Sequence, residues 1–433
     1  MMKHQPVMDI DKHRQPLVAV VIVNWNGWRH TIAACRSLDR STHQALEVII
    51  VDNASTDESL ARLRAAVPHA HIIANPVNDG FSGACNIGMR YAVQSGCDYV
   101  FLLNNDALVE RQTIAALVSA SKAKKDSALL GSAVVYISSG EYQFFGSRRC
   151  PIIREPEFFT FEKDGALLAQ DTIETDSILG AAFFIPAGVL DRVGLFDERF
   201  FLNYEETDFC YRARKQGIPS LIVPASLVSH HANASLGSYP APMQAYFLAR
   251  NGLLFAEKHG PAEQRRLLFL LKRHYWDMRR AWRATPRKYL PTRAIQRAFW
   301  DYAWRRFGDC PTQIRRMDSM YRDLADAPKS LSEILSDALT PAFWKARFRE
   351  LSQARHLSGA EKADLIGTSM AIGFGTLIFG GLLLDASISF VASVFHEPEF
   401  ARMHAIGFVM AGGLGVVFAS WFFADAVRRQ TWY

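Results

Sequence analysis

Four short apolar runs in the first quarter of the chain each end in a cluster of small polar residues, and this pattern constrains the fold most. The runs are Val18–Val23, Val48–Val51, His71–Ala74 and Tyr99–Leu103. Helical patterns separate them, near Arg29–Leu38, after the capping box at Ser55–Glu58, and over Gly83–Gln94. Strands that alternate with helices at this pitch form a parallel sheet covered on both faces, so we expect an α/β fold.

Polar residues and glycines follow each of the four runs. Because ligands bind at the carboxyl ends of parallel strands, we expect these residues to share one binding edge. They include Asn24, Asn26, Asp52, Asn78, Gly80, Gly83, Asn104, Asn105 and Asp106. An aspartate such as Asp52 accepts a hydrogen bond from a base or ribose, and glycines let backbone amides approach a phosphate. Each alone is an ordinary turn residue, but four clusters in series predict a binding site.

Composition narrows the ligand and the compartment. The chain has 433 residues, 49% of them hydrophobic, which is enough for two or three domains. Its net charge is +6, and acids and bases are evenly mixed in the first half, which favours a small phosphorylated ligand there. The six cysteines are scattered without a CxxC pair, as in a reduced cytosolic protein. Residues Met1–Leu17 lack the apolar stretch of a signal peptide.

The second half of the chain differs in character. From Pro242 to about Glu350 the pattern is helical, basic and rich in Arg, Trp and Tyr. Composition alone leaves two readings open, a solvated face of a helical bundle and a surface for lipid headgroups. The position of this region just before two long apolar runs favours the lipid surface.

The two apolar runs, Leu365–Leu384 and Ala405–Ala424, contain no charged residue. Each is about long enough to cross ~30 Å of hydrocarbon. Lys and Arg flank the pair, whereas Phe395–His404 between them holds only Arg402. A buried hairpin in a soluble protein is the alternative, but this charge bias predicts a transmembrane hairpin in the cytoplasmic (inner) membrane, with the large domain and both termini on the cytoplasmic side.

Seven segments in order along the chain carry a family resemblance. They are Val20–Asn26, Ile50–Asp57, Asn78–Gly88, Leu103–Asp106, Gly180–Ile185, Gly194–Glu198 and Glu205–Cys210. Together they resemble family 2 of the inverting nucleotide-sugar glycosyltransferases, which have the GT-A fold, and most closely its rhamnosyltransferase and galactofuranosyltransferase branch. The resemblance covers about Leu17 to Asn251 and implies a mostly parallel sheet, with Asn86 among the donor-binding residues.

The resemblance also implies a divalent cation. Family members bind it with a D-x-D motif, whose place is taken here by Asn104, Asn105 and Asp106. Asp106 would hold the ion against the donor diphosphate, and Asn104 stands where the family has aspartate. His230 fits the later histidine that completes the ion site, with His231 as the alternative. Oxygen and nitrogen ligands together suit Mg²⁺ or Mn²⁺.

The catalytic base is expected in the pair Glu205-Glu206. Inversion needs one carboxylate to take the proton of the acceptor hydroxyl, and the family pattern selects the second acid, Glu206, where aspartate is usual. Both acids also suit a helix N-terminus. Asp208 and Arg212 lie four residues apart and predict a structural ion pair. The aromatic run Phe200–Tyr204 is expected to wall the acceptor site.

One position departs from some family members. They carry an arginine that touches the donor phosphates, and Cys85 stands at that place. Charge compensation would then come from the cation, from backbone amides or from Arg250.

The sequence thus divides into a polar tail over 1–16, a GT-A domain over 17–255, a helical basic region over 256–362, and the hairpin with a short tail over 363–433. We expect an inverting glycosyltransferase that moves a deoxyhexose such as rhamnose, or a hexose, from a dTDP- or UDP-linked donor to a lipid-linked saccharide acceptor in cell-surface polysaccharide synthesis. The question of a homo-oligomer stays open.

Three other functions were weighed. A catalytically inactive, membrane-anchored scaffold that binds sugar nucleotides would be expected to have lost Asp106 or the Glu205-Glu206 pair. A nucleotidyltransferase would need a Gly-rich segment with Lys or Arg near the first strand, which Asn24–Gly27 is not. A nucleic-acid binder would leave the first domain unexplained, so no nucleic acid is expected as a partner.

Overall fold

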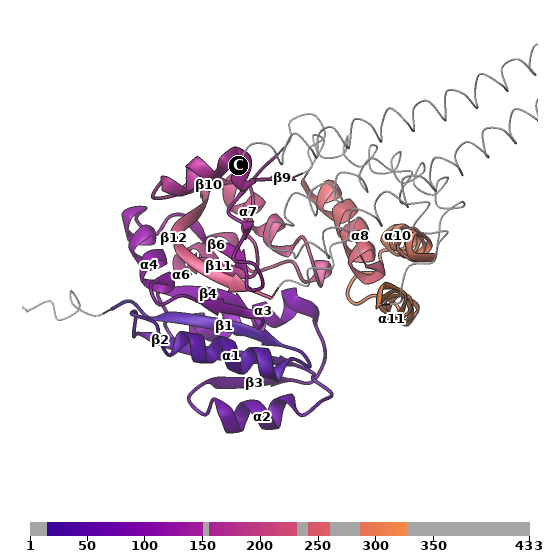
Figure 1. Cartoon of the computed structure of the whole chain (residues 1–433), viewed down its shortest axis with the longest axis horizontal. Coiled ribbons are helices and arrows are strands. Elements are labelled where there is room, and N and C mark those ends of the chain that lie inside the picture. Colours follow the sequence, from indigo (N-terminus) through magenta and orange to yellow (C-terminus); the bar gives the residue numbers. More distant parts are fainter. Residues whose placement is uncertain (1–14, 150–155, 232–240, 260–285, 327–433) are drawn as a thin grey trace, which may run out of the picture. The chain divides into compact units, whose positions relative to one another are not determined.

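A ten-stranded mixed sheet forms the centre of the protein (Figure 1). The computed structural model describes residues 15–149, 156–231, 241–259 and 286–326, and residues up to Leu324 belong to one compact unit. The strand order is β10-β12-β6-β11-β4-β1-β2-β3, with β5 paired to β12 and β7 paired to β6. The strands are β1 Val18–Asn24, β2 Leu46–Asn53, β3 His71–Asn75, β4 Tyr99–Asn104, β5 Ala107–Val109, β6 Leu129–Tyr136, β7 Tyr142–Phe144, β8 Ser147–Arg149, β9 Pro156–Phe158, β10 Ile173–Thr175, β11 Ala182–Pro186 and β12 Ser220–His230.

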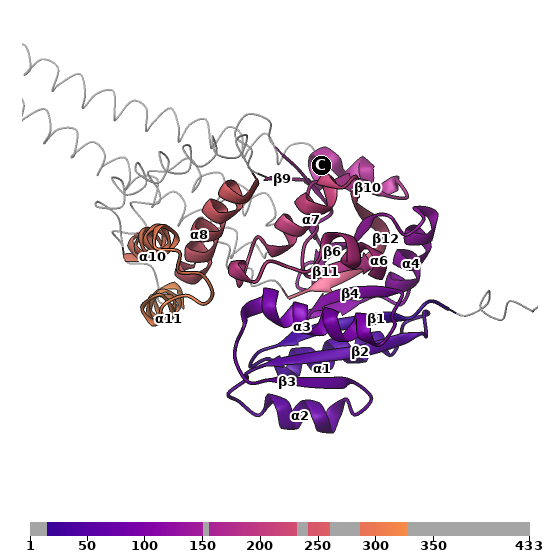
Figure 2. The same cartoon turned by 180° about the vertical axis from the view of Figure 1, so that it is seen from behind.

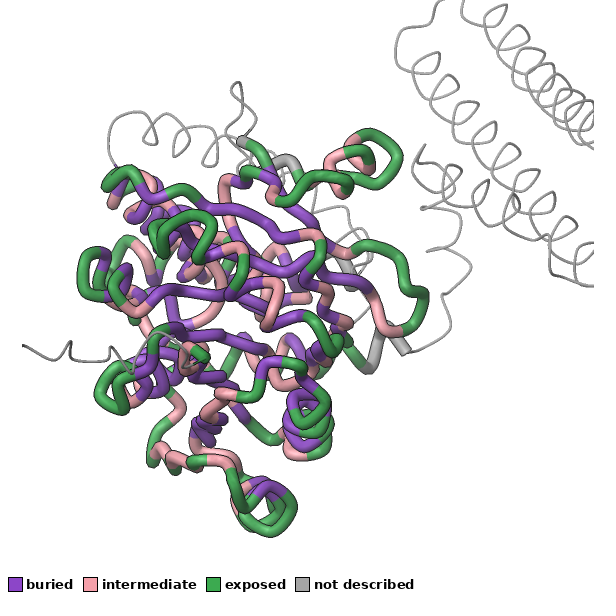
Figure 3. The backbone as a smooth tube through the Cα atoms, turned by 90° about the vertical axis from the view of Figure 1, so that its left-hand side faces the viewer, coloured by how far each residue is buried: buried purple, intermediate pink, exposed green. Residues whose placement is uncertain are grey.

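Helices cover the sheet and continue beyond it. The α-helices are α1 Trp28–Leu38, α2 Ser59–Ala66, α3 Gly80–Gln94, α4 Thr113–Ala123, α5 Phe161–Asp164, α6 Ala187–Val193, α7 Glu205–Lys215, α8 Pro242–His259, α10 Pro286–Ala303 and α11 Thr312–Asp326, with 3-10 turns η2 Gly165–Ala169 and η3 Glu198–Phe200. Helices α1 and α3 lie on opposite faces of the sheet (Figures 1 and 2). The strands between them are buried along most of their length (Figure 3).

The N-terminal half of the sheet confirms the predicted parallel α/β arrangement. Strand β1 lies between β2 and β4 and is parallel to both, and β3 continues the parallel set beside β2. The four predicted strands are all present, within two residues of their expected bounds. Their apolar residues face helices on both sides, as a buried parallel strand requires.

The other half of the sheet is mixed: β12 is parallel to β6, but the remaining pairs are antiparallel. Strand β11 runs antiparallel to both β4 and β6, so the sheet is mixed rather than mostly parallel. A parallel connection needs a crossover of a dozen or more residues, usually a helix. The regular strand–helix alternation stops after β6, and the described residues between β6 and β11 form short strands, the four-residue helix α5 and the 3-10 turn η2. The apolar stretch Ile178–Pro186 also predicts a strand from the sequence, and the observed strand is shorter because β11 begins at Ala182.

The predicted capping box at Ser55–Glu58 is wrong. The Ser55 hydroxyl donates to Asp52 Oδ1 at 2.6 Å, so it does not cap a helix. Helix α2 begins at Ser59, whose backbone N–H donates to Asp57 Oδ1 at 2.9 Å. Ser55 therefore belongs to the loop after β2, and not to the N-terminus of α2 as the sequence pattern predicted.

The helical expectation after Pro242 is confirmed for the described part of that region. Helix α8 packs against α10, and an apolar cluster joins Tyr246 and Phe247 of α8 to Ala294 and Ala298 of α10. The apolar runs 365–384 and 405–424, and the hairpin they predict, lie outside the described residues. Among the described residues, no helix is long and apolar enough to cross a membrane. The domain boundaries at 255 and 362 stay predictions.

Close contact between α3 and β1 gives a test of the packing. Gly88 on α3 faces β1, and a Cβ atom there would collide with Val21 Cγ1. Overpacking of this kind destabilises by roughly 1–3 kcal/mol, so Gly88→Ala should lower the free energy of unfolding by that amount in chemical denaturation.

Gly188→Ala on α6 is the matched control. An added Cβ there meets nothing within 4 Å, so alanine should raise the free energy of unfolding by about 0.5–1 kcal/mol. Equal effects of the two substitutions would contradict the close α3–β1 contact.

Candidate active site

Strand register brings the first polar residues together. Asn24 at the end of β1 pairs with Asp52 of β2, and the preceding Val23 pairs with Asn104 of β4. The buried Asn24 amide donates to Asp52 Oδ1 at 2.7 Å and to Ser55 Oγ at 3.1 Å. The predicted common edge is therefore present, and Asp52 sits at its centre with its carboxylate fixed.

Amide side chains join the successive loops at this edge. Asn26 Oδ1 accepts from the backbone N–H groups of Thr56 at 2.8 Å and Asp57 at 3.3 Å. Asn53 Nδ2 donates to Asn78 Oδ1 at 3.0 Å, and Asn78 Oδ1 also accepts from the Gly80 N–H at 2.9 Å. Two of the predicted donor-binding residues, Asn26 and Asn78, thus hold the loops in place.

Two predicted residues lie deeper than a ligand contact requires. Asn86 is buried, and its amide bonds to the backbone of Phe196 at 2.9 and 3.0 Å and to Glu198 Oε1 at 2.8 Å. Gly80 has φ of +71° and faces the Phe201 carbonyl, where a Cβ atom would collide. Both residues support the loop from the protein side, and Gly83 packs against Asp79 in the same way.

The D-x-D position and the later histidine meet. Strand β5 pairs with β12, which places Asp106 Oδ1 3.0 Å from His230 Nε2. Asn104 Nδ2 lies 3.3 Å from the same nitrogen, and His230 Nδ1 lies 3.0 Å from Gln143 Oε1. The three groups Asp106, Asn104 and Gln143 surround one imidazole ring, which joins positions 126 residues apart.

The structure separates the two histidines. The His231 ring packs edge-on against the His30 ring at 5.3 Å between centroids, and only its backbone N–H contacts Asp106, at the carbonyl. His230 alone points its ring at the Asp106 carboxylate. In the described part of the chain no group of three or more His, Cys, Asp or Glu side chains is arranged to hold a metal ion, so Asp106 and His230 offer one carboxylate and one imidazole.

The chemistry of this donor set fits a cation. One Nε2 atom cannot donate its proton to Asp106 and at the same time accept from the Asn104 amide. With the Asn104 amide turned so that its oxygen faces the His230 ring, lone pairs of that oxygen, of Asp106 Oδ1 and of His230 Nε2 would point to one place. Oxygen and imidazole ligands of that kind suit Mg²⁺ or Mn²⁺, with further ligands from a diphosphate and water.

The acid pair opens helix α7 in two different environments. Glu205 is 2% exposed, and its Oε2 atom has no hydrogen-bond partner among the described residues. Glu206 lines a pocket of about 250 Å³, and its carboxylate lies against Gly180. Burial raises the pKa of both carboxyls, and the negative charge of Glu206 raises that of Glu205 further. Glu206 is therefore the member of the pair that a ligand reaches.

Asp208 has a structural role, as predicted. It accepts from Arg212 Nε at 2.8 Å, and also from Lys258 Nζ at 2.9 Å and His259 Nε2 at 2.8 Å. Burial alone would raise the pKa of Asp208, but the His259 hydrogen bond and the two cations hold it below the ordinary value. The carboxylate is thus fully engaged between α7 and α8.

The pocket beside Glu206 has an aromatic wall. Phe144, Phe158, Tyr204, Tyr211 and Leu248 line it, with Asn203 and residues 176–180 on other sides. The expected wall from the run Phe200–Tyr204 is only partly correct. Phe200 and Phe201 turn inward, and the Phe201 ring stacks on Phe247 at 5.5 Å.

Arg250 does not reach a ligand, contrary to the expectation. It is fully buried, and its guanidinium donates to the carbonyls of Phe200 at 3.1 Å and Gly308 at 2.6 Å. Cys85 is buried as well, beside the acid pair, and burial raises the pKa of its thiol. In the sequence Arg250 stands in an apolar helical run. That context indicates a buried arginine, which packs in the core and donates to carbonyls.

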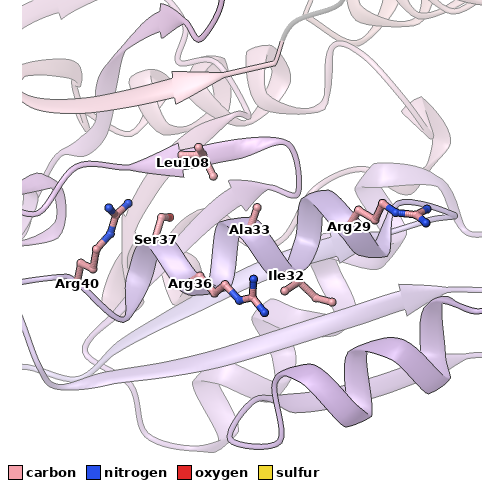
Figure 4. Close-up of a pocket in the computed structure, with 7 residues that line it drawn as sticks. All are labelled: Arg29, Ile32, Ala33, Arg36, Ser37, Arg40 and Leu108. Carbon is pink, nitrogen blue, oxygen red and sulfur yellow. The ribbon is translucent and has the colours of Figure 1, made fainter.

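A second pocket, of about 400 Å³, lies along α1. Leu108 of β5 and Ile32 and Ala33 of α1 form its apolar part. Figure 4 shows Arg29, Arg36 and Arg40 spread along the helix and pointing in different directions. Their guanidinium groups do not converge on one point, so this groove is not the site of a compact phosphorylated ligand.

Comparison with known proteins identifies the domain. The family model "Glycosyl transferase family 2" matches residues 19–183, which hold β1 to β4, the D-x-D position and the Gly180 loop. Two solved structures are distantly similar: GalNAc-T7 with UDP, GalNAc and Mn²⁺ (17% identity, 58% of this chain, 52% of that chain, TM-score 0.43), and mannosyltransferase PcManGT from Pyrobaculum calidifontis with GDP-Man and Mn²⁺ (15%, 72% and 81%, TM-score 0.41). At these scores neither assigns a fold or a ligand.

Three curated relatives are transferases. The dTDP-rhamnosyl transferase RfbF of Shigella flexneri is 23% identical over 252 residues (56% of this chain, 80% of the relative). The low-salt glycan biosynthesis hexosyltransferase Agl10 of Haloferax volcanii is 26% identical over 211 residues (46% and 62%). The N-acetylglucosaminyl-diphospho-decaprenol L-rhamnosyltransferase of Mycobacterium tuberculosis is 24% identical over 265 residues (56% and 85%). The chain therefore carries a glycosyl transferase family 2 domain, and the protein is a glycosyltransferase.

Proposed function

We propose that the protein inverts the anomeric centre as it moves a sugar from a nucleotide-diphosphate donor to a lipid-linked saccharide. One observation carries the proposal: residues 180 and 181 link the two candidate groups. The Glu206 carboxylate lies against Gly180, where an added Cβ atom would collide with Oε1, and the next carbonyl, of Ala181, accepts from the Asn104 N–H at 3.2 Å. The base and the diphosphate site are thus neighbours across one dipeptide.

The donor would lie along the edge formed by the first loops. Asp52 would face the nucleoside, and Asp106, His230 and Asn104 would hold the divalent cation. That cation, when bound, neutralises the charge of the departing diphosphate. The nucleotide would be dTDP or UDP and the sugar rhamnose or another hexose, because the relatives include a dTDP-rhamnosyl transferase and a hexosyltransferase.

The acceptor would enter the pocket lined by Tyr204, Tyr211 and Phe158, whose faces suit the apolar side of a sugar ring. Glu206 takes the proton from the acceptor hydroxyl. The hydroxyl oxygen then bonds to the anomeric carbon from the side opposite the diphosphate, and the bond from that carbon to the diphosphate oxygen breaks. An inactive scaffold finds no support in a site where Asp106 and Glu206 are both in place.

The cation is tested first at Asp106. Asp106→Ala should abolish turnover and weaken binding of the nucleoside diphosphate with Mg²⁺ or Mn²⁺, because it removes the one carboxylate beside His230. Calorimetric titration measures the binding, and the exposed Asp39→Ala is the control that should leave it unchanged. Full activity of the wild-type protein in EDTA would refute the cation requirement.

The base is tested by three matched substitutions. Glu206→Gln keeps size and hydrogen-bonding shape but removes the base, so kcat should fall by roughly 10²-fold or more with donor binding nearly unchanged. Glu205→Gln should lower kcat less, and Asp208→Asn should act mainly on stability. A near-normal kcat in Glu206→Gln with a dead Glu205→Gln would move the role to Glu205.

The raised pKa of Glu206 sets the pH dependence. A base works only when deprotonated, so the wild-type rate should fall as the pH falls through a value above that of an ordinary glutamate. The acidic limb of the rate against pH should lie correspondingly high. A limb at the ordinary glutamate value would show that the carboxyl is solvated during turnover.

Membrane attachment is part of the proposal and rests on the sequence of residues 365–384 and 405–424. A reporter fused after Tyr433 should be found on the cytoplasmic side of membrane fractions, because both ends of a hairpin with positive flanks stay inside. Recovery of the full chain in the soluble fraction, or a reporter on the outer side, would refute the topology.

A further inference from the structure

The loop Phe200–Tyr204, directly before the acid pair, has an unusual backbone. Phe201, Asn203 and Tyr204 have φ of 62°, 68° and 79°. Non-glycine residues seldom adopt this left-handed region, and they stay there only where the surroundings hold them. Tyr204 is the last residue before α7. The backbone of this loop therefore sets the direction in which the Glu205 and Glu206 side chains project from the first turn of the helix.

Helix α8 supplies the surroundings on one side. The buried Asn251 amide nitrogen donates to the carbonyls of Phe200 at 2.7 Å, Leu202 at 2.7 Å and Asn203 at 2.8 Å. An amide has two hydrogens, so at least one is shared among these three carbonyls. A single side chain therefore bonds three carbonyls of this one loop.

Arg250 fixes the orientation of that amide. Its Nε donates to Asn251 Oδ1 at 3.1 Å, which leaves the Asn251 nitrogen facing the loop. The same guanidinium donates to Phe200 O at 3.1 Å and to Gly308 O at 2.6 Å, in the turn between α10 and α11. Carbonyl dipoles stabilise the buried charge of Arg250, and its guanidinium in turn anchors the loop.

The loop also touches the proposed donor edge and the acid pair. The Ser82 N–H donates to Phe201 O at 3.2 Å, beside Gly80. At its other end, Tyr204 leads directly into Glu205 at the start of α7. The loop therefore connects α8, the donor loop and the two acids through backbone contacts at both of its ends.

We infer that Arg250 and Asn251 are positioning residues, which hold the Phe200–Tyr204 loop so that Glu206 meets the acceptor hydroxyl in a fixed orientation. The inference rests on the proposed role of Glu206 as base. Ordinary core packing would explain the burial of the two side chains. It does not account for a single amide that bonds three carbonyls of one loop next to the acids, in which three residues have positive φ.

Asn251→Ala in the full-length protein tests the inference. Loss of the three carbonyl contacts should lower kcat about 10- to 100-fold while the donor KM stays within about threefold, because the donor edge is intact and the base is misplaced. The acidic limb of the pH–rate profile should shift, since the surroundings of Glu206 change. Amide hydrogen exchange of residues 201–206 should become at least about tenfold faster.

Two further variants keep the test decisive. Arg250→Lys replaces Asn251→Ala as the test variant if the latter does not fold. It retains the positive charge but loses the planar guanidinium, so kcat should fall by less than is expected for Asn251→Ala. Asp318→Ala is the matched control: this buried carboxylate accepts from the Met243 N–H at 3.0 Å at the other end of α8. It should lower the unfolding midpoint without changing kcat of the folded protein.

The outcomes separate two failures. If the wild-type protein turns over no nucleotide sugar, the proposed function is wrong. Hydrogen exchange then still shows whether Asn251 holds the Phe200–Tyr204 loop in place. Unchanged exchange of residues 201–206 in Asn251→Ala, or a loss of kcat no greater than in Asp318→Ala, would overturn the positioning role. A fall in kcat with faster exchange of residues 201–206 in Asn251→Ala, together with an unchanged kcat in Asp318→Ala, would support it.

Discussion

The parallel register of β1 between β2 and β4 is the constraint on which the candidate site depends. It aligns the strand ends so that Asn24 meets Asp52, with Asn104 one step away on the other side. Hydrogen bonds between side-chain amides and the neighbouring loops then hold the edge rigid. A slip of one residue between β1 and β2 would turn Asp52 to the opposite face of the sheet. Everything proposed for the donor follows from that alignment.

The acid pair depends on a different kind of support. Two adjacent carboxyls placed in a buried helix start are unfavourable, because burial raises the pKa of both and the negative charge of Glu206 raises that of Glu205 further. Three left-handed residues before them add roughly 1–3 kcal/mol each. Contacts from α8 offset this strain, with Asp208 tied to Lys258 and His259 and the loop tied to Asn251. Helix α8, which lies outside the matched family segment 19–183, therefore holds the proposed base in place.

Local pattern was enough to predict the parallel half of the fold. The runs ending at Val23, Val51 and Leu103 are apolar on both faces, and their polar ends converge as expected, as do Asp106 and His230. The antiparallel direction of β11 and the strands β5 and β6 were not predicted, since they depend on pairings more than 50 residues away. The Asn251 clamp was missed for the same reason. An Arg-Asn pair in an apolar helix carries no local sign of the carbonyls it meets.

The stereochemistry of transfer tests the central claim most directly. The proposed mechanism uses one base, Glu206, and a single displacement at the anomeric carbon, with no protein nucleophile on the opposite face of the sugar. Proton NMR of the product formed by the full-length protein, from a nucleotide sugar that it turns over, reads the anomeric configuration. Inversion relative to the donor is the predicted result. Retention would contradict the account, because it requires a second displacement or a front-side attack for which Glu206 as a general base has no role.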